Sequence, residues 1–186
     1  DDIDQYSADI SFMGAGYYNR VQSFPRLLNH DFKIWGTEWA FESLDGSRVQ
    51  NKNKRVDPFD VVKIYNAGKI NLNLHSSTSH EGVNPVGDFV NPRTFEIAAC
   101  GGFQLVDERS EKDDLKHNGL EEDTFSSIDD LCENVDYFLK NEGEARSIAA
   151  RGKIRVLKNH TIQHRMHEML THVSVSYTHL TLPTKA

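Results

Sequence analysis

With 186 residues, of which 38% are hydrophobic and 26% charged, the chain can form one core of α/β domain size and lacks the composition of a disordered protein. Its formal net charge of -7 argues against nucleic acid as a partner, because nucleic-acid binders usually carry a basic surface that displaces counterions. Two cysteines, Cys100 and Cys132, and the lack of any apolar run of about 18 residues indicate a cytoplasmic protein with unpaired thiols and no transmembrane segment.

The two ends of the sequence are atypical. The chain begins at Asp1 without an initiator methionine, in an acidic stretch that we expect to lead directly into a strand, as an internal linker does. The last residues, SVSYTHLTLPTKA, look like translated sequencing-adaptor sequence and are excluded from the fold prediction. We therefore expect one domain over residues 1–173 and a non-native tail over residues 174–186.

Between these ends, apolar runs alternate with helical patterns, which predicts stacked βα units around a mostly parallel sheet. Four strands are expected, at ADISFMGAG (8–16), FKIWG (32–36), INLNLHSS (70–77) and FQLVDE (103–108). Helices are expected at 18–28, 58–68, 91–102 and 126–141, followed by two helices over 144–170 with a break near Asn159. The predicted fold class is α/β, a Rossmann-like parallel sheet flanked by helices.

Two of the predicted helices carry clear boundary signals. Pro58 lies near the start of one of them, where its missing N–H costs nothing, and Gly68 follows as a stop signal. The helix at 126–141 begins at a capping serine, either Ser126 or Ser127, and its apolar residues recur on one face.

The segment NPRTFEIAACGG (91–102) provides the main functional signal. Glu96 lies one turn into a helix that starts beside a strand end, so its carboxylate can point into the crevice of the sheet and accept both hydroxyls of a ribose. The same helix start offers unpaired backbone N–H groups and a partial positive charge, which suit a phosphate. The alternative is an ordinary amphipathic helix with Glu96 on its solvent face.

Six segments stand in order along the chain: SFMGAGYYNR, KIYNAGKINLNLH, NPRTFEIAACGGFQLVDE, FSSIDDLCENVDYFL, IAARGKIRVLKNHT and HRMHEML. Together they resemble the C-terminal domain of the spore maturation protein CgeB-like family, a group similar to the GT-B glycosyltransferases. The resemblance covers residues 8–172. It implies that the chain is the C-terminal half of a GT-B fold.

The resemblance also implies a set of donor-binding residues. Glu96 matches the second acid of the GT-B motif, which binds the nucleotide ribose, and Asp88 stands eight residues earlier, where the first acid lies near the donor sugar. Asp88 departs from the motif, which usually has glutamate there. Thr94 and Phe95, beside Glu96, belong to the same implied site. Arg93 lies one turn from Glu96 on the same face, so it can meet a phosphate or form a salt bridge with Glu96.

Gly14 and Gly16 follow the first strand, where glycine lets the backbone approach a phosphate closely. The dinucleotide fingerprint requires a third glycine at Asn19, and its ribose-binding acid is matched only loosely by Glu38, which argues against an NAD-binding domain. The family resemblance implies instead that Asn19 and Arg20 lie near the pyrophosphate. The alternative is a tight turn with Arg20 in solvent.

Histidines occur at two further places. His75 ends the third strand, where Asn71, Asn73 and His75 alternate with apolar residues; His75 can contact the donor phosphate or sugar, or form part of a polar strand end with all its hydrogen bonds made. His160, His164 and His167 share one helical face, but no cysteine or orienting carboxylate accompanies them, so we predict no metal site.

The implied reaction is glycosyl transfer from a nucleotide diphosphate sugar to an unknown carbohydrate, protein or lipid acceptor. Arg20 or Arg93 would stabilise the charge that grows on the leaving phosphate, with no bound metal and no cofactor. The general base would come from a missing N-terminal domain, so this fragment alone is expected to be inactive. The alternatives are a noncatalytic spore-coat or surface assembly module and an NAD-type dehydrogenase domain.

Overall fold

The computed structural model describes residues 2–40, 44, 46–84, 89–109 and 121–180. Its centre is a five-stranded sheet in the order β2-β1-β3-β4-β5, in which all neighbouring strands are parallel. The strands are β1 (Ala8–Met13), β2 (Phe32–Trp35), β3 (Gly68–Asn73), β4 (Gln104–Asp107) and β5 (Asp123–Phe125). The predicted Rossmann-like parallel sheet is confirmed.

Seven α-helices and three short 3-10 turns are assigned in the described residues. The α-helices are α1 (Asp2–Tyr6), α2 (Tyr18–Ser23), α3 (Pro58–Ala67), α4 (Arg93–Cys100), α5 (Ile128–Lys140), α6 (Glu142–Asn159) and α7 (Ile162–Leu180). The 3-10 turns are η1 (Phe24–Leu27), η2 (Gly46–Arg48) and η3 (Asn51–Asn53).

The expected helix boundaries hold where a local hydrogen bond fixes them. Ser127 is the cap of α5, because its side chain accepts the N–H of Asp130. Gly101 ends α4 with φ of 88°, a left-handed conformation that glycine adopts without strain. The break between the last two helices also occurs where it was predicted, after Asn159.

Other element boundaries differ from the prediction for physical reasons. Helix α2 ends at Ser23 and continues as the 3-10 turn η1, because Pro25 cannot donate the next α-helical hydrogen bond. Strand β3 ends at Asn73 because the backbone of Leu74 and His75 bonds to side chains rather than to a neighbouring strand. The acidic start contains the short helix α1, and β5 was not predicted at all.

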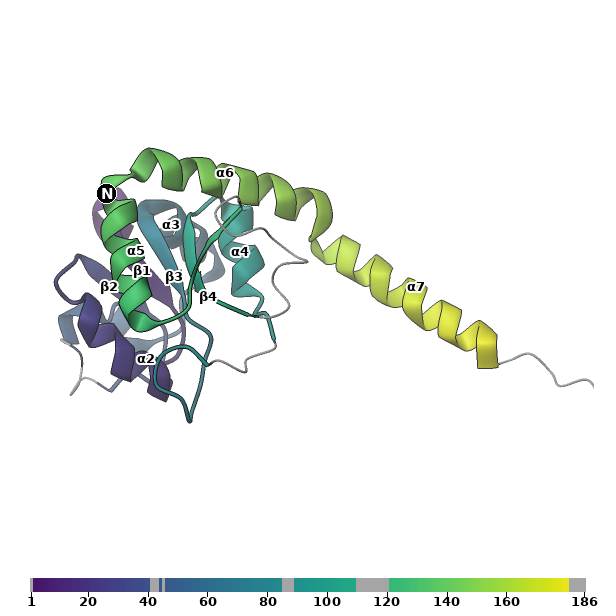
Figure 1. Ribbon diagram of the computed structural model, residues 1–186, viewed down its shortest axis with the longest axis horizontal. Helices are drawn as coiled ribbons and strands as arrows, with labels where there is room; N and C mark the ends of the chain where they lie inside the picture. Colours follow the sequence, from purple (N-terminus) through teal and green to yellow (C-terminus); the bar gives the residue numbers. More distant parts are fainter. Residues whose placement is uncertain (1, 41–43, 45, 85–88, 110–120, 181–186) are drawn as a thin grey trace, which may run out of the picture.

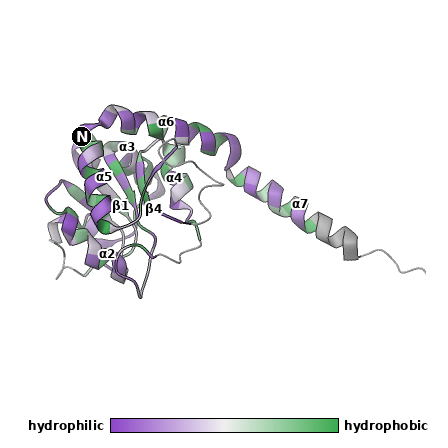
Figure 2. Ribbon diagram, viewed as in Figure 1, coloured by the Kyte–Doolittle hydropathy of each residue, from purple (hydrophilic) through white to green (hydrophobic). Residues whose placement is uncertain are grey.

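The helices cover both faces of the sheet (Figure 1). On one face, α2, η1 and α5 enclose a core that includes Phe12, Phe24 and Phe125. The other face is covered by α3 and α4, with a small cluster of Tyr6, Trp35 and Ile64 beside α1 and α3. Hydrophobic residues are concentrated in the strands and on the inner sides of the helices (Figure 2).

The two C-terminal helices have different environments. Helix α6 packs along α4, whereas α7 extends away from the sheet (Figure 1). His160 at the break accepts a hydrogen bond from Arg165 at 2.8 Å, and both side chains contact the Phe95 ring of α4. In the part of the chain that the structure describes, no helix has the length and hydropathy needed to cross a bilayer.

We expect Gly152→Ala to lower the free energy of unfolding by about 2 kcal/mol, because its methyl group has no room. A β-carbon at Gly152 would stand 2.3 Å from the Glu121 carbonyl oxygen, on the segment that leads into β5. Denaturant unfolding followed by circular dichroism measures the change. The matched control is Gly143→Ala in the same helix, where a β-carbon would meet nothing within 4 Å. The control should gain up to about 1 kcal/mol from helix propensity, and equal losses in both variants would contradict this explanation.

Candidate functional site

The strand order places the candidate site at the carboxyl ends of β1 and β3. In the sheet, β2 lies on one side of β1, and β3, β4 and β5 follow on its other side. The strand order therefore reverses between β1 and β3. In open α/β sheets, ligands bind in the crevice that forms where the strand order reverses in this way. The residues after β1, those after β3 and the start of α4 meet at this crevice, so the predicted side chains can be located there.

Arg20 bridges the two strands at this point. Its Nε and Nη2 donate to the Leu74 carbonyl at 3.1 and 2.8 Å, and its Nη1 donates to the Ala15 carbonyl at 2.9 Å. The side chain is buried, so the predicted alternative of an arginine in solvent is not observed. A guanidinium has five N–H donors, so these three bonds leave part of its hydrogen-bonding capacity unused.

Arg93 brings a second positive charge to the same place. The guanidinium carbons of Arg20 and Arg93 lie 4.9 and 6.0 Å from the centre of the Phe12 ring. Burial and the charge of Arg93 lower the pKa of Arg20 to about 10, so the Arg20 guanidinium remains charged at neutral pH. Within the described residues, neither arginine forms an ion pair, and Nε of Arg93 is buried without a hydrogen-bond partner. Two guanidinium groups that form no ion pair are suited to binding an anion.

Glu96 lies in the first turn of α4, at the carboxyl edge of the sheet, with its side chain exposed. The salt bridge considered between Arg93 and Glu96 is not formed. Tyr65 lies close to both: burial raises its pKa to about 12, the charge of Glu96 acts in the same direction, and a hydrogen bond and charge from Arg93 oppose it. The Glu96 carboxylate therefore lies in the same helical turn as Arg93, forms no ion pair with it and is open to a ligand.

A network of side chains fixes the start of α4. Asn91 donates to the Asn73 side chain at 2.9 Å, and Asn73 donates to the Thr94 hydroxyl at 3.0 Å. The Asn91 side chain also accepts the Thr94 N–H. The N–H groups of Phe95 and Glu96 bond to the Pro92 carbonyl, so within the described residues Arg93 has the one first-turn amide that is not bonded. Arg93 therefore contributes both its amide and its side chain to the site.

Asn19 and the two glycines make contacts within the protein. The Asn19 amide donates to the carbonyls of His75 and Gly82 and accepts the Ser77 N–H, so the side chain ties α2 to the loop after β3. The N–H of Gly14 bonds to the Trp35 carbonyl at the end of β2, the N–H of Gly16 bonds to the Thr37 carbonyl, and a β-carbon on Gly16 would lie 2.4 Å from a backbone oxygen. These residues hold the loop that leads into α2, where Arg20 lies.

His75 is buried, and both of its ring nitrogens are used. Nδ1 lies 2.6 Å from Asp107, and Nε2 accepts the Asn91 N–H at 3.0 Å. Burial raises the pKa of Asp107, but the hydrogen bonds of His75 and the charges of His75 and Arg109 outweigh it and lower the pKa below its usual range. The ring orients the segment that enters α4. Asp107 and Arg109 were not predicted, although the polar end of FQLVDE was a signal.

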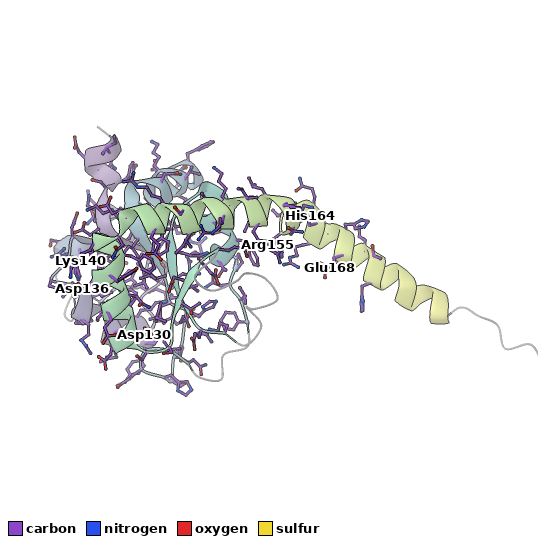
Figure 3. The ribbon with its side chains drawn as sticks, turned by 45° about the horizontal axis from the view of Figure 1, so that its top comes forward. Asp130, Asp136, Lys140, Arg155, His164 and Glu168 are labelled. Atoms are coloured by element: carbon purple, nitrogen blue, oxygen red, sulfur yellow. The ribbon has the colours of Figure 1, made fainter. Side chains whose placement is uncertain are left out.

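The remaining predicted site residues lie elsewhere. Phe95 packs against the break between α6 and α7, and Asp88 lies outside the described residues. In the described ranges, no three His, Cys, Asp or Glu side chains are placed to hold a metal ion. Figure 3 shows His164 on the part of α7 that extends away from the sheet.

A cavity of about 490 Å³ opens at the opposite, amino edge of the sheet. The ends of α3 and α4 line it together with α6, including Lys69, Arg146 and Lys153. Two of these cations have local partners: Lys69 pairs with Asp9, and Lys69 and Arg146 both pair with Glu142. We place the candidate site at the carboxyl edge because the unpaired arginines lie there.

Comparison with known proteins shows the family to which the chain belongs. The model of a family described as glycosyl transferase-like matches residues 19–171. The chain belongs to this glycosyl transferase-like family. Spore protein CgeB of Bacillus subtilis (strain 168) is 28% identical over 112 residues, which are 55% of this chain and 35% of CgeB. The predicted resemblance to CgeB-like proteins is thereby confirmed.

Solved structures of glycosyltransferases share the fold. HepE of Anabaena, solved in complex with UDP-glucose, matches with a TM-score of 0.63 at 14% identity, over 93% of this chain and 52% of HepE. The C-terminal domain of the group 1 glycosyl transferase LpcC from Francisella tularensis matches with a TM-score of 0.56 at 13% identity, over 86% of this chain and 90% of that domain. The glycosyl transferase-like chain therefore has the fold of a GT-B C-terminal domain and spans about half the length of HepE.

Proposed function

We propose that this glycosyl transferase-like domain binds a nucleotide diphosphate sugar at the carboxyl ends of β1 and β3 and takes part in transfer of the glycosyl group. The convergence of Arg20 and Arg93 on Phe12, without a carboxylate partner among the described residues, is the observation that carries the proposal. The diphosphate supplies the missing negative charge. Membership in the glycosyl transferase-like family supports a glycosyl donor as the ligand.

Glu96 would bind the ribose of the donor. A carboxylate is a pure acceptor with two oxygens, so it can accept from both hydroxyls of a ribose at once. Its position in the same helical turn as Arg93 supports a ribose beside a phosphate that Arg93 binds. Asp88, by family resemblance, would contact the donor sugar.

The chemical role of the arginines follows from the charge of the leaving group. Negative charge grows on the distal phosphate as the bond to the sugar breaks, and preorganised cations stabilise that charge more in the transition state than in the bound donor. Arg93 is placed for this role by the fixed start of α4, and Arg20 by its bonds to the two strand ends.

Isothermal titration tests the proposal with UDP, GDP and inorganic pyrophosphate, since HepE was solved with UDP-glucose. We expect heat of binding with pyrophosphate and stronger binding with at least one nucleoside diphosphate. Binding of NADH in preference to both nucleotides, followed by its fluorescence, would favour the dehydrogenase alternative. No heat with any nucleoside diphosphate would contradict the proposal.

A further inference from the structure

Arg109 is a buried arginine with unused hydrogen-bond donors. It stands two residues beyond the end of β4, and its Nη2 donates to the Asp107 carboxylate. Its Nε and Nη1 are also buried and have no hydrogen-bond partner in the described residues. The side chain is 1% exposed, so bulk water does not solvate these two nitrogens.

Two donor nitrogens of a buried cation that make no hydrogen bond cost free energy. Buried polar groups normally have hydrogen-bond partners, and buried charged groups need them even more. Asp107 alone does not remove this cost, since its other oxygen bonds to His75. The Phe89 ring lies 5.7 Å from the guanidinium and compensates in part through a cation–π contact. An acceptor oxygen from a ligand would satisfy the two unbonded nitrogens of Arg109.

The position of Arg109 points to the same ligand as Arg20 and Arg93. Asp107 contacts Arg109 directly and lies close enough to Arg20 for its charge to act on that guanidinium. Both arginines therefore lie at the carboxyl edge, where the candidate site is, and of the two only Arg109 pairs with Asp107 in the described residues. Phe89, half exposed, lies over the Arg109 guanidinium and against the His75 ring.

We propose that Arg109 is a third binding residue for the ligand, which donates Nε–H and Nη1–H to an anionic or hydroxyl oxygen once the Phe89 side chain moves aside. The inference rests on the proposed function and extends it. It implies that the bound nucleotide sugar reaches the end of β4 as well as the ends of β1 and β3. The oxygen belongs either to the diphosphate or to the sugar. Asp107 holds the guanidinium in place, and His75 holds Asp107.

The test compares Arg109→Lys with the wild-type chain in titrations with inorganic pyrophosphate, UDP and UDP-glucose. Lysine keeps a cation beside Asp107 but lacks the planar pair of donors. We expect about tenfold weaker binding, from loss of charge-assisted hydrogen bonds. Weakening with all three ligands assigns the oxygen to the diphosphate, and weakening with UDP-glucose alone assigns it to the sugar. The matched control is Arg26→Lys, which changes an exposed arginine paired with Asp129 and should change nothing.

A second variant is expected to change the affinity in the opposite direction, so the proposal can still be tested if the first variant misfolds. Phe89→Ala removes the cover from Arg109 and should tighten ligand binding about threefold, since no cation–π contact has to be broken. Unchanged affinities in both variants would overturn the role of Arg109 while leaving donor binding intact. Pyrophosphate binding that depends on Arg109 in a chain that binds no nucleotide would instead overturn the proposed function. A wild-type chain that binds none of the three ligands overturns both.

Discussion

Arg93→Met should weaken binding of UDP and of pyrophosphate alike, by about 100-fold, because it removes a cation and its charge-assisted hydrogen bonds to the diphosphate. Methionine preserves much of the side-chain volume beside Phe12. It also relieves the repulsion with Arg20, whose pKa should rise, so the folded chain should not lose stability. Isothermal titration measures both affinities, and thermal unfolding checks the fold.

The control for Arg93→Met also tests the location of the site. Arg146 lies in α6 at the cavity on the amino edge and is exposed. Arg146→Met should leave both affinities unchanged. If Arg146→Met weakened UDP binding and Arg93→Met did not, the nucleotide would occupy the amino-edge cavity and the proposed site would be wrong.

Glu96→Gln should distinguish the contribution of the ribose to binding from that of the phosphates. UDP binding is expected to weaken about tenfold, because an amide accepts the ribose hydroxyls less strongly than a carboxylate does. Pyrophosphate has no ribose, so its affinity should stay the same or rise slightly as a negative charge leaves the site. The same titrations measure this difference between the two ligands.

Glu133→Gln is the matched control for Glu96→Gln, since Glu133 is also an exposed helical glutamate but lies on α5. It should affect neither ligand. Equal weakening of UDP and pyrophosphate by Glu96→Gln would mean that Glu96 supports the fold of the site rather than the ribose. If the variant bound UDP like the wild type, the ribose would lie elsewhere.

Local signals in the sequence predicted most of the fold. Serine and glycine boundaries act through hydrogen bonds and backbone angles within a few residues, which explains why Ser127 and Gly101 were correctly placed. Strand β5 was missed because its three residues, Asp123–Phe125, are too few to show a hydrophobic pattern. The early end of β3 was missed because it depends on bonds from Arg20 and Asp107, which are distant in the sequence.

In the candidate site, too, some features were predicted from the sequence and others depend on contacts between distant residues. Family resemblance identified Arg93 and Glu96 through a contiguous motif, and the structure then showed Arg93 beside Arg20 without an ion pair to Glu96. By contrast, His75 was predicted to contact the donor or to end a strand, and its ring bonds to Asp107, 32 residues later. No spacing rule in one sequence indicates such a pair.

The sequence by itself determined that alternating strands and helices form a parallel sheet and that residues 91–102 begin a helix with an acid in its first turn. These features follow from periodicity and short-range hydrogen bonds. Only the tertiary structure decided which charged groups are paired and which are left for a ligand. That choice depends on burial and on contacts between strands, as Arg109 beside Asp107 illustrates, and both arise only when the chain is folded.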